Sequence, residues 1–258
     1  MSQALAQIHP NAILGKDVVI EAFSVVYDDV EIGEGTWIGP NVTLMPGTRI
    51  GKNCQIFPGA VIGAIPQDLK FEGEYSTAVI GDNTTIRECV TVNRGTKATQ
   101  QTIVGSHCLL MAYVHIAHDC ILGDRCIIAN SVQVAGHVHI DDYAILGGSG
   151  GVHQFNRIGK YAMVGAGVIV TKDVPPYTKA ARSPVSYIGI NAIGLRRNSF
   201  DNNSIKTIQE IYRALYANGM NNKEAIEHIE QNISPSTERD EILYFIKNSE
   251  RGIMRANM

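Results

Sequence analysis

An aliphatic residue recurs at every sixth position along the first two thirds of the chain. Between Ile8 and Val170, 25 of the 28 positions at this spacing hold Ile, Leu or Val. A period of six fits neither the turn of an α-helix nor the two-residue alternation of an ordinary strand. It is the hexapeptide-repeat pattern, which predicts short strands joined by tight turns, with three strands in each triangular coil of about 18 residues.

Coils of this kind stack, and equivalent strands of successive coils pair in parallel about 4.8 Å apart. The length of the repeat predicts about nine coils and the fold class β, as a parallel β-helix. A glycine often follows the aliphatic residue, as at Gly15, Gly33 and Gly105. We expect these glycines to adopt backbone angles that other residues resist.

Two stretches leave the repeat, and a third ends it. Polar residues replace the repeat at 64–79 and at 95–103, which predicts two loops that project from the β-helix and suit functional roles. Beyond the Pro-Pro break within 173–177 the apolar spacing becomes helical. The sequence therefore predicts a β-helix domain over 1–190 and a small α-helical domain over 191–258, which can cover the last coil.

Three helices are expected in the second domain. Ser204 is the expected N-terminal cap of the first helix, and Gly219 is its expected end. Ile226 and Ile229 mark the second helix, and the third opens at Ser236.

Composition and charge narrow the functional classes. A net charge of −3 argues against a dedicated nucleic-acid binder. No apolar run reaches the roughly 20 residues of a membrane span, and residues 1–4 show no basic start of a secretory signal. The cysteines form no CxxC pair and are odd in number, so we expect buried thiols and a cytoplasmic location.

Stacking brings several histidines to one ridge of the predicted β-helix. Residues one coil apart lie one above the other, so His118 is expected above Gly136 and Gln154, with His137 and His153 beside them. A neutral and oriented histidine can take a proton from a hydroxyl nucleophile near neutral pH. We therefore expect His118 to act as a general base.

Neighbouring residues supply further candidates for the same chemistry. Asp119 can interact with the imidazole, and the Gly136 N–H can donate to an oxyanion. Weaker candidates lie in the first predicted loop and beside the ridge: Gln67, Asp68, Lys70 and His115.

Basic residues gather in the predicted helical domain. The adjacent Arg196 and Arg197 suit a phosphate, and the remaining Lys and Arg residues of the tail can form a basic surface for an acidic carrier protein. The sequence holds no GxxxxGK[ST] motif, which argues against nucleotide hydrolysis, and it also holds no cysteine-based metal motif.

In these motifs and their order, the whole chain resembles the UDP-N-acetylglucosamine 3-O-acyltransferase family. The residues that carry the resemblance are Gln67-Asp68-Leu69-Lys70, Ile86-Arg87-Glu88, Asn93-Arg94-Gly95-Thr96, His115-Ile116-Ala117-His118-Asp119-Cys120, Ala135-Gly136-His137-Val138, Val152-His153-Gln154-Phe155 and Asp173-Val174-Pro175-Pro176-Tyr177.

The resemblance implies a left-handed β-helix and a homotrimer with active sites between neighbouring prisms. The implied reaction moves an (R)-3-hydroxyacyl chain from acyl carrier protein to the 3-hydroxyl of UDP-N-acetylglucosamine, in the first step of lipid A biosynthesis, with no metal or other cofactor. It gives His118 the role of base, Asp119 that of its partner and Gly136 that of oxyanion donor. The implied substrate contacts are Gln67, Asp68, Lys70, His115, His137, His153, Gln154, Asn191 and Arg197.

The chain differs from the family pattern after Asn191 and shows one further informative residue. Ile193 stands where the pattern has Glu, and Asn198 replaces the third of three basic residues.

The resemblance also makes Ala166 the ruler at the end of the acyl groove, the residue that limits the length of the acyl chain. Because alanine is small, a fairly long acyl chain is expected.

Three alternatives remain open from the sequence. The sister N-acyltransferase of the same pathway carries a large N-terminal domain, for which the repeat starting at Ile8 leaves no room. A γ-type carbonic anhydrase would need three histidines placed to bind zinc. A β-helix without enzymatic activity would leave the histidine ridge and both loops unexplained.

Overall fold

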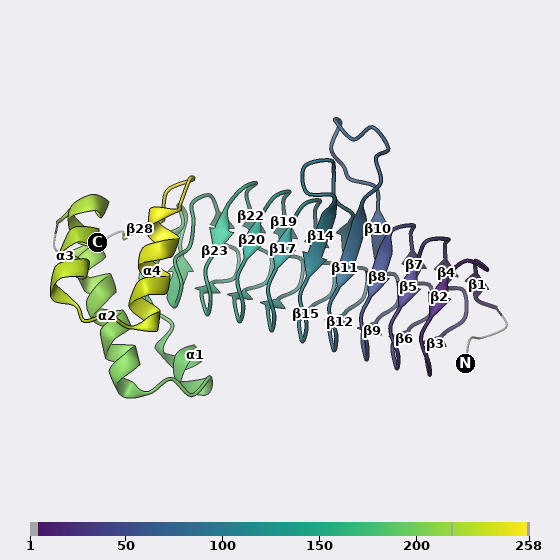
Figure 1. Cartoon of the computed structure of the whole chain (residues 1–258), viewed down its shortest axis with the longest axis horizontal. Helices are drawn as coiled ribbons and strands as arrows, with labels where there is room; N and C mark the ends of the chain where they lie inside the picture. The colour runs from purple at the N-terminus through teal and green to yellow at the C-terminus, as the bar shows by residue number, and fades with distance from the viewer. Residues whose placement is uncertain (1–4, 218, 257–258) are drawn as a thin grey trace.

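Three mostly parallel sheets surround one apolar core and form a left-handed β-helix, with a group of helices at its C-terminal end (Figure 1). The computed structural model describes residues 5–217 and 219–256. Residues 1–4, where the sequence shows no start of a secretory signal, lie outside this description. From β1 (Gln7–Ile8) to β26 (Thr178–Ala181), consecutive strands along the chain belong to different sheets, so each coil contributes one strand to each face.

The strands of the described chain fall into sheets of nine, eight and eleven. The first sheet contains β1 (Gln7–Ile8), β4 (Val25–Val26), β7 (Thr43–Leu44), β10 (Val61–Ala64), β13 (Thr91–Asn93), β16 (His115–Ile116), β19 (Gln133–Val134), β22 (Gly151–Val152) and β25 (Ile169–Val170). The second contains β2 (Ile13–Leu14), β5 (Glu31–Ile32), β8 (Thr48–Ile50), β11 (Thr77–Ile80), β14 (Gln101–Val104), β17 (Ile121–Leu122), β20 (His139–Ile140) and β23 (Arg157–Ile158). The third contains β3 (Val19–Ile20), β6 (Trp37–Ile38), β9 (Gln55–Ile56), β12 (Thr85–Ile86), β15 (Leu109–Leu110), β18 (Ile127–Ile128), β21 (Ile145–Leu146), β24 (Met163–Val164), β26 (Thr178–Ala181), β27 (Ser186–Ile190) and β28 (Arg255–Ala256).

The register between strands confirms the predicted coil. His115 pairs with Gln133, one regular coil further along, and neighbouring strands repeat this step over most of the prism. The aliphatic residue of each hexad points inward, and from Ile20 to Val170 these side chains are buried in one continuous core. Burial of this apolar surface is the main source of stability for the fold.

The glycines after the aliphatic residues serve a purpose other than the one expected from the sequence. Gly15, Gly33 and Gly105 do not adopt left-handed backbone angles. Instead, an ideal Cβ on Gly105 would lie 2.5 Å from the carbonyl oxygen of Gly123 on the next coil. These glycines are therefore required because successive coils approach too closely to admit a side chain.

Left-handed backbone angles occur elsewhere in each turn, three residues after the aliphatic residue, and mostly at residues other than glycine. Asp119 (φ 59°), His137 (φ 60°) and Phe155 (φ 63°) occupy this position on successive coils. Such angles are uncommon for residues with a side chain. The coil geometry imposes them at regular intervals, and the three side chains form one column along a corner.

Two loops leave the β-helix at the corner between the first and second sheets (Figure 1). They cover 65–76 and 94–100, so both are shorter than predicted. Ala64, residues 77–79 and residues 101–103 belong to strands, because Ala78 pairs with Thr102 and so continues the sheet at the base of the loops. The polar composition at these edges concealed the strands.

The C-terminal part contains α1 (Ala192–Arg197), α2 (Asn202–Ala217), α3 (Asn222–Asn232) and α4 (Thr237–Lys247). As predicted, Ser236 caps α4, and Gly219, with φ 67°, follows the end of α2. The predicted cap at Ser204 is wrong: the Asp201 carboxylate accepts from the N–H groups of residues 203 and 204, so α2 begins earlier.

The end of the chain returns to the β-helix. Strand β28 pairs with β27, so the range predicted as helical also contributes a strand. Met254, just before it, is fully buried in the core of the β-helix. The C-terminal segment therefore covers the last coil.

Two further expectations concern cysteines and membranes. Four cysteines are buried as expected, whereas Cys89 is exposed. In the described chain, no helix combines the length and the apolar character needed to cross a membrane.

We predict that Gly105→Ala destabilises the protein by about 1–3 kcal/mol, because the added Cβ would overlap the backbone of the next coil. Gly165→Ala is the matched control, since its Cβ would meet nothing closer than 3.5 Å. Thermal unfolding of the two variants measures the difference. Equal melting temperatures would contradict the close-approach explanation.

Candidate active site

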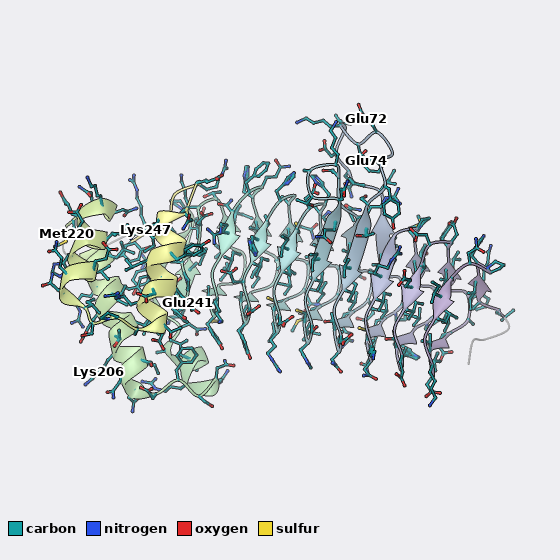
Figure 2. The ribbon with its side chains drawn as sticks, viewed as in Figure 1. Glu72, Glu74, Lys206, Met220, Glu241 and Lys247 are labelled. Atoms are coloured by element: carbon teal, nitrogen blue, oxygen red, sulfur yellow. The ribbon has the colours of Figure 1, made fainter. Side chains whose placement is uncertain are left out.

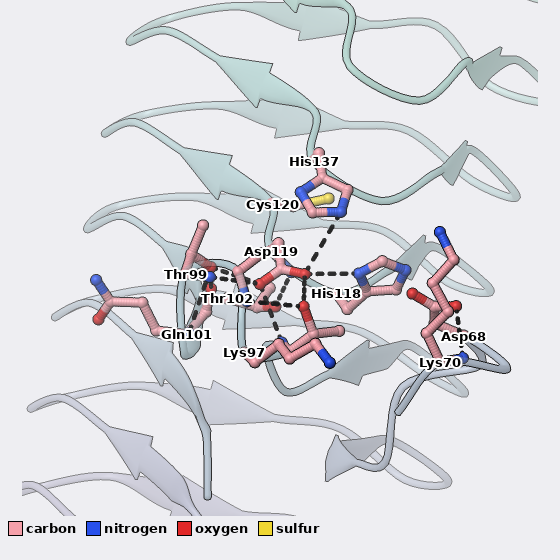
Figure 3. A network of polar contacts seen from close by, with 12 residues as sticks. Asp68, Lys70, Lys97, Thr99, Gln101, Thr102, His118, Asp119, Cys120 and His137 are labelled. Atoms are coloured by element: carbon pink, nitrogen blue, oxygen red, sulfur yellow. Dashed lines mark hydrogen bonds and ion pairs between the residues drawn. The ribbon is translucent and has the colours of Figure 1, made fainter. Parts of the chain in front are cut away.

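A histidine and an aspartate lie together in the turn after β16. The Nδ1 atom of His118 lies 2.7 Å from Oδ2 of Asp119, and both residues are buried (Figure 3). A carboxylate can only accept a hydrogen bond, so Nδ1 carries the proton. The Nε2 atom of His118 is therefore left with a free lone pair that can accept a proton.

Hydrogen bonds from the second loop hold the Asp119 carboxylate. Thr96 donates from its N–H (3.0 Å) and its hydroxyl (2.7 Å), and the Thr99 hydroxyl donates at 2.5 Å. Burial by itself raises the pKa of Asp119, but the hydrogen bonds from Thr99, His118 and Thr96 outweigh this effect and lower the pKa to about 2. Asp119 is therefore ionised at neutral pH.

Gly136 lies on the coil after His118, as predicted by counting one coil along the sequence. An ideal Cβ on Gly136 would lie 2.6 Å from Cε1 and 2.7 Å from Nε2 of His118, so any side chain would displace the imidazole. Within the described chain, its N–H donates to no protein acceptor. At another corner, the corresponding N–H of Ser106 donates to the Asp124 carboxylate. The Gly136 N–H is thus available to a ligand beside Nε2.

Two further histidines surround the pair. The ring of His137 packs edge-on against His118 at 5.1 Å and stacks on Phe155 at 4.6 Å. The Nδ1 atom of His115 lies 2.7 Å from the Thr91 hydroxyl. Burial lowers the pKa of both His115 and His137, and the nearby His118 contributes to the shift, so both rings are neutral at neutral pH.

A surface pocket of about 420 Å³ opens beside Nε2 of His118. Two predicted contacts from neighbouring coils, His153 and Gln154, lie in its wall, and His153 Nδ1 is also 3.2 Å from a guanidinium nitrogen of Arg251. The other predicted residues in the wall are Gln67, His115, His118 and Gly136. The structure thus brings together most residues of the predicted site.

The first loop brings two more predicted contacts near the pair. Asp68 and Lys70 lie close enough to influence the charge of His137, and Figure 3 shows them beside the His118 ring.

Three predicted residues lie neither in the pocket wall nor beside the His118–Asp119 pair within one chain. Asn191 is buried and caps α1: its side chain accepts from Gly194 N–H and donates to the carbonyl of Tyr161. Arg197 is exposed at the end of α1, and Ala166 is exposed in the turn after β24. One chain alone therefore leaves their predicted contacts untested.

The same cluster has the composition of a possible cation site. His118, Asp119 and His137 each place a ligand atom within 4.8 Å of the others. However, both carboxylate oxygens already accept hydrogen bonds from threonines, and one also accepts from His118. A metal held by all three residues would have to displace hydrogen bonds that the carboxylate already accepts, so the arrangement fits proton transfer better than a metal site made of these three residues.

Known proteins resemble this chain over most of its length. Residues 173–254 match the family described as Udp N-acetylglucosamine O-acyltransferase, domain 2, and residues 29–64 and 101–136 match the bacterial transferase hexapeptide. An acyl-[acyl-carrier-protein]–UDP-N-acetylglucosamine O-acyltransferase of Chlorobaculum parvum is 50% identical over 261 residues, covering 96% of this chain and 97% of that protein. The chain belongs to the UDP-N-acetylglucosamine O-acyltransferase family.

Solved structures of family members have the same architecture. LpxA from Bacteroides fragilis, a UDP-N-acetylglucosamine acyltransferase, matches with a TM-score of 0.98 at 50% identity, covering 99% of this chain and 100% of that one. LpxA from Acinetobacter baumannii matches with a TM-score of 0.95 at 42% identity, covering 98% and 99%. Family membership disfavours the carbonic anhydrase and scaffold alternatives.

The sequence did not reveal every residue of the site. Gln133 and Ile169 also line the pocket, and Phe155 supports His137. Gln133 could have been found by counting one coil from His115. Thr96 and Thr99 could not, because they lie in a loop where the repeat gives no positions.

We predict that Asp119 links the stability of this site to pH. Its folded pKa of about 2 lies below the reference value of about 3.9, so its contribution is present above pH 4 and is lost as the pH falls toward 2. That contribution is about 2 kcal/mol, and Asp119→Asn should remove this part of the acid dependence. Urea denaturation of both proteins between pH 7 and pH 2 tests it; parallel stability curves would contradict the assignment.

Proposed function

We propose that this protein transfers an (R)-3-hydroxyacyl chain from acyl carrier protein to the 3-hydroxyl of UDP-N-acetylglucosamine, the first step of lipid A biosynthesis. The observation that carries the proposal is the His118–Asp119 pair, whose free Nε2 faces a pocket beside an unpaired N–H. Similar proteins are named acyl-[acyl-carrier-protein]–UDP-N-acetylglucosamine O-acyltransferases, which supports the proposed donor and acceptor.

The geometry supports a direct transfer. Nε2 of His118 takes the proton of the sugar hydroxyl as its oxygen attacks the thioester carbon. The Gly136 N–H donates to the oxyanion of the tetrahedral intermediate. When the carbon–sulfur bond breaks, the proton on Nε2 passes to the departing thiolate of the carrier. The ionised Asp119 stabilises the imidazolium in between and holds the ring in place.

A homotrimer is part of the proposal. The apolar side chains of Tyr113, Met163 and Ile169 are exposed on or beside the faces that flank the pocket. In a trimer, a neighbouring chain can bring Arg197 and Ala166 toward the reacting atoms, which one chain does not do. Ala166 would then limit the acyl chain, and its small size favours a long one.

A cytoplasmic location is also part of the proposal. The free thiols of all five cysteines suit a reducing compartment. Neither a metal nor an organic cofactor is required for the transfer as written.

The deciding experiment measures acyl transfer to UDP-N-acetylglucosamine from carrier proteins loaded with 3-hydroxyacyl chains of increasing length. We expect the wild type to form the 3-O-acyl product, and His118→Ala to lose about 10²- to 10⁴-fold in rate. His139→Ala is the matched control, because His139 lies in the second sheet and outside the pocket.

The outcomes separate the parts of the proposal. Absence of product with wild-type protein would overturn the assigned reaction. Full activity of His118→Ala would overturn only the role of the base. Acylation of the amine of a 3-O-acylated sugar instead of the hydroxyl would favour the N-acyltransferase alternative.

We also predict that the reaction does not depend on a metal. Prolonged treatment with a strong chelator should leave both the transfer rate and the melting temperature unchanged, because His118 acts through its free Nε2. Metal content measured on the same samples provides the control. Loss of activity that zinc restores would show that His118, Asp119 and His137 form a metal centre.

A further inference from the structure

The second loop does more than close a gap between two strands. Within 94–100, Thr96 and Thr99 both aim their side-chain hydroxyls and their N–H groups at the Asp119 carboxylate. A third threonine, Thr102 in the strand β14 that follows the loop, accepts from the N–H of Asp119 at 2.8 Å. The loop thus surrounds the aspartate from the side opposite to His118 (Figure 3).

We propose that Thr96 and Thr99 are positioning residues for the base: they keep the Asp119 carboxylate fixed and satisfied, so that His118 holds its proton on Nδ1 and presents Nε2 to the substrate hydroxyl. The proposal rests on the function proposed above, and it assigns a role to residues that never touch the substrate.

The distribution of bonds over the two carboxylate oxygens supports this role. Oδ1 accepts from Thr99 and from the Thr96 N–H, whereas Oδ2 accepts from the Thr96 hydroxyl and from His118. The carboxylate therefore cannot rotate away from the imidazole without losing several charge-assisted bonds. His137 Nε2, 3.7 Å from Oδ2, is too distant to compete for it.

The first loop is tied to the second by acidic residues. Glu74 accepts from the N–H of Lys97 at 2.8 Å, and the Lys97 ammonium lies 3.7 Å from the Glu72 carboxylate. Figure 2 shows Glu72 and Glu74 on the outermost loop of the β-helix. The loop that carries Gln67 and Lys70 is thereby linked through the threonines to the base.

Competition for the carboxylate gives the proposal a measurable signature. Each hydrogen bond that is removed from the Asp119 carboxylate leaves more of its negative charge uncompensated. The carboxylate then stabilises the protonated form of His118 more strongly. The other titratable groups around the pair are His115, His137, Cys120, Asp68 and Lys70, and the substitutions change none of them. Loss of a threonine hydroxyl should therefore move the acid limb of the rate profile to higher pH.

The test compares Thr99→Val and Thr96→Val with the serine variants Thr99→Ser and Thr96→Ser in the full-length protein. We expect each valine variant to lower kcat about tenfold, with a smaller change in KM for the sugar, and to shift the acid limb of kcat/KM to higher pH. Serine, which keeps the hydroxyl, should restore both. Thr84→Val is the control, because the Thr84 hydroxyl bonds to Gly105 and Cys108 in the wall of the β-helix.

A second measurement does not depend on catalysis. The ¹⁵N resonances of the His118 ring, followed from pH 5 to 9 without substrate, report the tautomer and the protonation of the imidazole. We expect Nδ1–H in the wild type and in the serine variants, and a changed titration in the valine variants. If the wild type transfers no acyl group, the proposed function fails, and these resonances still decide the role of the threonines.

Two results would overturn the proposal. One is a loss of activity that is uniform across pH and accompanied by unchanged His118 resonances, as expected for damage to the loop alone. The other is an equal shift of the acid limb in Thr84→Val. If one valine variant unfolds, the test uses the other valine variant and the serine variants.

Discussion

Close stacking of coils through parallel backbone hydrogen bonds is the constraint on which the rest of the structure depends. Each strand pairs with the equivalent strand of the next coil, and the glycines allow an approach that would place a Cβ within 2.5 Å of the neighbouring backbone. Because the register cannot slip without exposing the core, every turn residue has a fixed neighbour above and below. His118 faces Gly136 for this reason, and Asp119, His137 and Phe155 form a column.

The ionised Asp119 carboxylate beside the base is the group in this site that would destabilise the fold most if it were not compensated. A buried charge destabilises a fold unless hydrogen bonds or an opposite charge compensate it. Here the compensation comes from outside the repeat, through Thr96 and Thr99 in a loop that the coils tolerate because Ala78 and Thr102 still pair at its base. The insertion thus leaves the register intact and supplies donors that the turns cannot offer.

Regular features of this protein could be predicted from its sequence, and irregular ones could not. The period of six predicted the sheets, and counting by one coil placed His118 above Gly136. The same pattern led to a wrong explanation of the glycines. It shows where glycine occurs, but it does not show whether glycine is needed for an unusual backbone angle or for the close approach of the next coil. The pattern did not reveal that the Asn191 side chain caps α1, because this helix is too short to show a periodicity, and the predicted substrate contact of Asn191 stays a prediction. Thr96 and Thr99 act across a loop, where no repeat relates sequence to position.

The turns at two corners of the β-helix differ in which backbone N–H groups they leave unpaired, and this difference fits the position of the site. At the corner between the second and third sheets, Asp82, Asp124 and Asp142 accept the turn N–H groups of the neighbouring coil, which seals that edge. At the corner between the first and second sheets, both loops depart and the Gly136 N–H stays free. A ligand that needs a donor and a base together can therefore find both at this corner, and the loops that leave it hold the base in place.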